Sequence, residues 1–141
     1  MRPPAILYFE RLYLASLGLS VIGWAISWPV LSARMAVDPR TAGFGWLLPA
    51  GLALSVAISL ALWFFVARRA SRIARTIAVV LTALSVLRLL LNLPAMLNGA
   101  MPPLAAILSI ATVALGVMAV MALYRPDARS WFGEDFEGDA A

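Results

Sequence analysis

The sequence predicts an all-α membrane protein: a four-helix transmembrane bundle whose helices run up, down, up and down through a bilayer. Of its 141 residues, 63% are hydrophobic and only 13% are charged. Soluble domains are about 45–50% apolar and about 25% charged. The mean hydropathy of +0.92 also exceeds what a water-soluble core of this size could bury. Finally, four long apolar runs alternate with short polar segments.

The four apolar runs cover residues 12–31, 46–66, 73–93 and 104–123. A helix of about 20 residues rises about 30 Å, which is the thickness of a bilayer's hydrocarbon core. Backbone polar groups in lipid must bond internally, so only helices or closed barrels span it. The runs lack strand-like alternation, so we expect one helical transmembrane domain over residues 1–132.

Polar breaks separate the runs where turns are needed. They cover residues 38–43, 67–72 and 98–103, and the last ends in two prolines placed to begin a helix. Pro29 and Pro94 lie near the ends of the first and third runs. Because proline removes a helix hydrogen bond, we expect these two residues to end or kink their helices.

Arginines predict the orientation. If the N-terminus is cytoplasmic, only Arg34 and Arg40 lie outside, and the inner side holds eight arginines: Arg2, Arg11, Arg68, Arg69, Arg72, Arg75, Arg125 and Arg129. Cytoplasmic loops are rich in basic residues, so both termini are expected to be cytoplasmic. The same rule explains the formal charge of +4 without a nucleic-acid partner.

The C-terminal segment changes character after Tyr124. Pro126 is expected to open a short helix on the inner membrane surface, with Trp131 and Phe132 dipping into it. Residues 133–141 contain four carboxylates and are expected to form an acidic, disordered tail.

Small residues recur every three or four positions in each span. Helices in lipid associate by close packing, so these stripes are expected to face inward in a left-handed bundle. A functional cavity along the stripes is a second hypothesis. The alternative is that small residues are simply common in membrane helices. The stripes are Ser16, Ser20, Gly23 and Ser27; Gly51, Ser55 and Ser59; Ala78, Thr82 and Ser85; and Ser109, Thr112, Gly116 and Ala119.

Arg88 is the principal candidate for a ligand-binding residue. A cation within a membrane helix costs roughly 2.5–3.5 kcal/mol on insertion scales, so it usually faces protein or water. Ser85 and Asn92 lie one turn away on either side and complete the candidate site. Alternatively, the third helix ends near Leu91 and Arg88 extends to the outer headgroups.

A second candidate surface is a basic patch that binds anionic lipid headgroups or sets the topology, formed by Arg68, Arg69, Arg72 and Arg75. Glu10, just before the first span, is expected to compensate charge at the helix N-terminus, or to pair with Arg11 or with this patch. The first span could instead belong to a cleavable signal peptide. After this span, residues 32–36 place an arginine where a signal-peptidase site needs small residues, so cleavage is not expected.

The residue types argue against several chemistries. The chain contains no Cys and no His, the usual thiolate and imidazole ligands of metals. No set of nucleophile and base is recognisable, so we expect neither an enzyme nor a cofactor or metal. We expect a protein that binds a membrane-protein partner or lipid through its helices. The alternative is a small homo-oligomeric transporter or channel for an anionic or amphipathic solute that uses Arg88.

Three features resemble small four-span bacterial inner-membrane proteins of unknown function. They are a short basic start before residues 11–17, an arginine-rich link after the second span, and a final helix that closes with residues 123–132. The resemblance implies a multi-pass protein of the bacterial inner (plasma) membrane. Small multidrug transporters also have four helices, but they depend on a glutamate in the first helix, where residues 16–21 contain no acid.

Overall fold

The computed structural model describes residues 1–133, which form helices and turns without a strand. The order is α1 (Pro4–Val37), the short 3-10 helix η1 (Ala42–Phe44), α2 (Leu47–Ala67), α3 (Arg72–Leu97), α4 (Pro103–Ala122) and α5 (Pro126–Trp131). Within this part of the chain, α1 to α4 are each long and apolar enough to cross a membrane. The prediction of an all-helical protein with four candidate spans is therefore confirmed.

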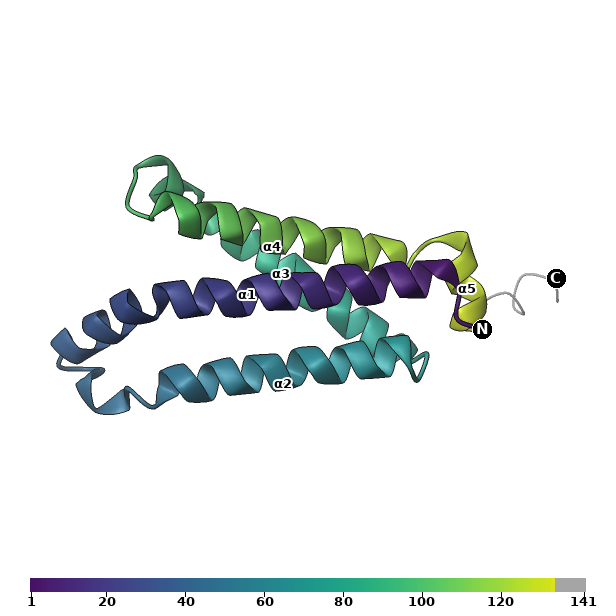
Figure 1. Ribbon diagram of the computed structural model, residues 1–141, viewed down its shortest axis with the longest axis horizontal. Coiled ribbons are helices and arrows are strands. Elements are labelled where there is room, and N and C mark those ends of the chain that lie inside the picture. The colour runs from purple at the N-terminus through teal and green to yellow at the C-terminus, as the bar shows by residue number, and fades with distance from the viewer. Residues whose placement is uncertain (134–141) are drawn as a thin grey trace.

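The long helices run in alternating directions, as the colours in Figure 1 show. Helix α1 lies between α2 and α4, and α3 crosses behind α1 at an angle. The N-terminus, the α2–α3 link and α5 lie at one end, which we call the capped end. The opposite end, which we call the open end, carries η1 and the α3–α4 turn.

Helix α1 extends well beyond the apolar run at residues 12–31. It starts at Pro4, where the missing N–H of proline is no loss, and ends before Pro39, which disfavours helix in the preceding residue. Pro29 lies inside α1 and Pro94 lies inside α3. Of the two expected outcomes, a helix end or a kink, the helix end is therefore wrong, since neighbouring helices and local adjustments tolerate proline within membrane helices.

The links next to α3 use local backbone chemistry. Ser71 caps the helix, because its hydroxyl oxygen accepts a hydrogen bond from the Ala74 N–H at 3.2 Å. The preceding Ala70 has a φ of 50°, a left-handed conformation that alanine adopts at a cost. At the other end, Gly99 has a φ of 70°, and the Ala100 N–H bonds back to the Ala95 carbonyl. Such a closure is typical of a helix C-terminus.

The hydrophobic core lies at the capped end. Its buried side chains come from the first turns of α1, the last turns of α2 and α4, the first turns of α3, and α5; they include Ile6, Phe9, Val66, Leu123 and Phe132. Towards the open end the helices expose large apolar side chains, such as Leu54 at 63% and Leu91 at 73%. So much exposed apolar surface requires lipid as its solvent, as expected for a multi-pass membrane protein.

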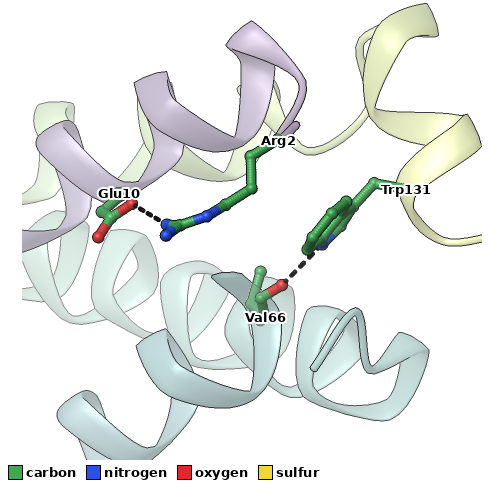
Figure 2. Close-up of polar contacts among 4 residues, drawn as sticks. All are labelled: Arg2, Glu10, Val66 and Trp131. Carbon is green, nitrogen blue, oxygen red and sulfur yellow. Dashed lines mark hydrogen bonds and ion pairs between the residues drawn. The ribbon is translucent and has the colours of Figure 1, made fainter. Parts of the chain in front are cut away.

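Helix α5 packs into the core. Phe132 is only 4% exposed, and the Trp131 indole N–H donates to the Val66 carbonyl at 3.3 Å (Figure 2). The expectation that Phe132 dips into the membrane was therefore wrong, because this ring is buried within the protein, whereas Trp131 is half-buried. Apart from Gly133, the predicted acidic tail lies outside the described residues.

Two carboxylates fix the start of α1. Asp127 of α5 accepts a hydrogen bond from the Ala5 N–H at 3.0 Å, so it satisfies one of the free donors at the helix N-terminus. Glu10 pairs with Arg2 at 2.9 Å (Figure 2). The expected pairing of Glu10 with Arg11 or the basic patch was wrong, because Arg2 folds back along the first turns of α1 to reach it.

Candidate functional site

Two openings separate the helices on the open-end side of the core. The first is a cavity of about 400 Å³ between α1, α3 and α4. The second, about 480 Å³, is a groove between α2 and α3. We call them the α1/α3/α4 cavity and the α2/α3 groove. Ser85 and Arg88 line both, so these two residues lie where the openings meet.

The polar part of the α1/α3/α4 cavity is rich in hydrogen-bond donors and contains no carboxylate. The polar side chains that line it are Ser20, Ser27, Ser85, Arg88, Asn92, Ser109 and Thr112. Trp24, Leu31, Met96 and Met101 are among the apolar residues that complete the lining. A guanidinium surrounded by hydroxyl and amide groups in an apolar enclosure is an environment suited to an anion.

The stripes of small residues on α1 and α4 do face each other. Nearest the core they touch: the Ser16 hydroxyl donates to the Thr112 carbonyl at 2.8 Å, and a Cβ placed on Gly116 would lie 3.7 Å from the Ser16 oxygen. Farther towards the open end, Ser20, Gly23 and Ser27 line the cavity instead. The inward stripe thus serves packing in one half of the bundle and lines a cavity in the other.

The α2/α3 groove is mainly apolar. Its large lining residues are Leu54 and Ile58 of α2 and Leu81 and Leu84 of α3, and the small residues of the α2 stripe also line it: Gly51, Ser55 and Ser59. The four large side chains are each at least 40% exposed. This groove therefore offers hydrocarbon contacts along its length and a cation at one end.

Arg88 lies well inside α3. The helix continues to Leu97, about 14 Å farther along its axis at 1.5 Å per residue. The alternative that α3 ends near Leu91 is therefore wrong. Among residues 1–133, no hydrogen bond or ion pair engages the Arg88 side chain, which is exposed to the two openings. A charge at this depth is stabilised only by a polar partner or water.

Ser85 and Asn92 lie on the same face of α3 as Arg88, but their donors are partly used by their own helix. The Ser85 hydroxyl donates to the Leu81 carbonyl at 2.9 Å, and the Asn92 amide donates to the Arg88 carbonyl at 2.7 Å. The structure thus brings the three predicted residues together around the cavity. Arg88 is the one whose charge and donors remain directed into it.

The predicted basic patch is divided into two parts. Arg72 donates to the Phe132 and Gly133 carbonyls, both at 2.9 Å, and Arg75 lies over the rings of Tyr124 and Phe132. Arg68 and Arg69 remain exposed at the end of α2, above the rings of Trp63 and Phe64 respectively. Within the patch, Arg72 and Arg75 hold the C-terminal segment, whereas Arg68 and Arg69 face outward.

Sequence reasoning placed Ser20, Ser27 and Ser109 on inward stripes, mainly for packing and with a cavity along the stripes as a second hypothesis, but it did not name them as site residues. Their spacing placed them on the inward faces of α1 and α4, which was the available signal. The space between those faces depends on how far α3 lies from α1 and α4, and the sequence carries no pattern for that distance.

Among residues 1–133, no cluster of three Cys, His, Asp or Glu could hold a metal ion. No family model matches the chain, and no curated protein or solved structure matches it.

Proposed function

We propose that this chain is a non-enzymatic, multi-pass protein of the bacterial inner membrane that binds another membrane component, a lipid or a membrane-protein partner. Binding takes place in the half of the bundle that holds the α1/α3/α4 cavity and the α2/α3 groove. The observation that carries the proposal is the Arg88 guanidinium, which lies at the junction of both openings without a partner among the described residues. An intramembrane cation of this kind is expected to have a functional partner.

The arginines support an orientation with the capped end in the cytoplasm. That end carries the N-terminus, the α2–α3 link and α5, which hold Arg2, Arg68, Arg69, Arg125 and Arg129. The open end carries Arg34 and Arg40. By the positive-inside rule, both termini are then cytoplasmic and the Arg88 site opens towards the outer leaflet.

The side chains around Arg88 favour binding over catalysis. They are hydroxyls, one amide and apolar groups, which can orient a ligand and exclude water. A general base would need a side chain that takes up a proton near neutral pH, such as a carboxylate, and the lining of these two openings supplies none.

Purification tests the proposal. The wild type, Arg88→Gln and the matched control Arg129→Gln are extracted from membranes in a mild detergent, and bound components are identified by native mass spectrometry. Arg129 is also exposed but lies at the capped end, outside the basic patch. We expect a reproducible component on the wild type and on Arg129→Gln that is lost from Arg88→Gln. If none of the three proteins carries a bound component, or if all three carry the same amount of it, the proposal is contradicted.

A second candidate is a homo-oligomeric transporter for an anionic or amphipathic solute. The observation in its favour is that the openings lie on one side of a core that closes the capped end. This arrangement resembles one of the two states of alternating access. Flux into liposomes is measured for the wild type and Arg88→Ala. Equal flux in both, or none in either, removes this candidate.

A further inference from the structure

We infer that the Arg88 site takes an amphiphile with one small anionic head group, a carboxylate or a phosphate monoester, and a single hydrocarbon chain. The head lies at Arg88 in the α1/α3/α4 cavity, and the chain lies in the α2/α3 groove. This inference rests on the proposed function and names the chemical class of the ligand.

The head group is assigned from charge and donors. Arg88 presents a planar set of N–H groups that matches carboxylate and phosphate oxygens in pairs. The hydroxyls of Ser20, Ser27 and Ser109 line the same cavity, and none has a hydrogen-bond partner among residues 1–133. An anionic oxygen can accept from all of these donors. A neutral ligand would leave the guanidinium charge uncompensated in a low-dielectric region, which is costly.

The chain is assigned from the shape and lining of the groove. From Gly51 to Ser59 the groove follows α2 for about 12 Å at 1.5 Å per residue. A single hydrocarbon chain is thin enough to lie between Leu54 and Ile58 on one side and Leu81 and Leu84 on the other, where it would contact apolar side chains along its length.

The relative position of the two openings gives the ligand a direction. Arg88 lies at the open-end limit of the α3 residues that line the groove, and Leu81 lies nearer the core. A head held at Arg88 would therefore direct its chain towards the middle of the bilayer. In the proposed orientation, this is how an amphiphile lies in the outer leaflet, so it could enter sideways from the lipid between α2 and α3.

Binding of three ligands with the same chain tests the inference. Oleate, oleyl phosphate and oleyl alcohol are titrated into the full chain in nanodiscs of zwitterionic lipid. We expect at least tenfold tighter binding of one or both anions than of the alcohol. Arg88→Gln should lower anion binding to the level of the alcohol, whereas Arg88→Lys, which keeps the charge but loses the planar pair of donors, should retain only part of it. The anion that binds more tightly identifies the head group.

A second pair of variants tests the groove. Ser55 lines the groove and Ala57, on the same helix, does not. Ser55→Trp should weaken binding of all three ligands by tenfold or more, and Ala57→Trp should leave it unchanged. This pair, together with the comparison of anion and alcohol on the wild type, decides the matter even if Arg88→Gln fails to fold.

The outcomes separate this inference from the proposed function. Equal binding of anions and alcohol, or anion binding unaffected by both Arg88→Gln and Ser55→Trp, overturns the inference. If purification still yields a neutral lipid or a protein whose binding depends on Arg88, the proposed function stands without this inference. If no component depends on Arg88 in either experiment, both are overturned.

Discussion

At the scale of single residues, most arginines lie in the end turns of helices, in the links between them or just before α1. The exceptions are Arg11, in the third turn of α1, and Arg88, far inside α3. Several find partners there, such as Arg2 with Glu10 and Arg72 with the Phe132 carbonyl. Arg88 departs from this rule in the middle of an apolar helix. A departure of this kind is retained only where the charge has a use, which is why the functional proposals centre on it.

Ala70 is a residue whose backbone conformation disfavours its own side chain. Its φ of 50° costs a non-glycine residue roughly 1–2 kcal/mol, and glycine removes this cost while losing about 0.5–1 kcal/mol of chain entropy. We therefore predict that Ala70→Gly raises the free energy of unfolding by about 0.5–1 kcal/mol. Thermal unfolding in detergent measures the effect.

Ala57→Gly in the interior of α2 is the matched control. The same substitution there should lower the stability by about 1 kcal/mol, since α2 has ordinary helical geometry at that residue. If both variants are destabilised to a similar degree, the left-handed conformation of Ala70 is not a source of strain.

At the scale of elements, the contact between α1 and α4 depends on small residues that let the backbones approach. A Cβ at Gly116 would lie in ordinary van der Waals contact with the Ser16 oxygen, at 3.7 Å, so the further atoms of a larger side chain would have to fit against α1. We predict that Gly116→Leu lowers the stability by about 1–3 kcal/mol through overpacking. Thermal unfolding in the same detergent measures it.

Gly18 of α1 has the same helical setting but no atom of another element near its Cβ position. Gly18→Leu should therefore show only the better helix propensity of leucine, a gain of up to about 1 kcal/mol. Opposite signs for the two variants support the packing contact. If both variants lose the same amount of stability, the loss comes from replacing a glycine in a helix and not from the contact between α1 and α4.

The short helix α5 contributes to the core through Phe132. Because this ring is 4% exposed and lies against Arg75, we predict that Phe132→Ala destabilises the protein by about 3 kcal/mol or more. Phe44→Ala, at an exposed ring of η1, should change the stability by less than about 0.5 kcal/mol. Unfolding midpoints that match for the two variants would show that α5 is dispensable for the fold.

The elements also show which parts of the fold could be predicted. The four spans followed from apolar run length, because lipid imposes that length on any helix that crosses it. The extra turns of α1 and the passage of α3 through Pro94 did not follow, since tertiary packing and lipid decide how far a helix continues. The same holds for the site: the spacing placed Ser85, Arg88 and Asn92 on one face of α3, whereas contacts between distant residues, such as Asp127 with Ala5, follow only from the assembled bundle.

At the scale of the whole molecule, the bundle is asymmetric along its length. The described core lies at the capped end, and the two openings lie between it and the open end. The tightly packed end also carries most of the arginines, so packing and charge distinguish the same two ends. A protein built in this way can hold its helices together at one end while the other end accommodates a ligand.

The orientation of this asymmetric bundle can be tested directly because the chain contains no cysteine. We predict that single cysteines at Arg69 and Ser130 react with a membrane-impermeant thiol reagent only after the membrane is opened. Cysteines at Gly43 and Asn98 should react in intact cells, since these residues lie in the links of the open end. Labelling of residues 69 and 130 from opposite sides would contradict an even number of crossings between them. Labelling of both pairs with the reverse accessibility would instead keep the four spans and place the Arg88 site in the inner leaflet.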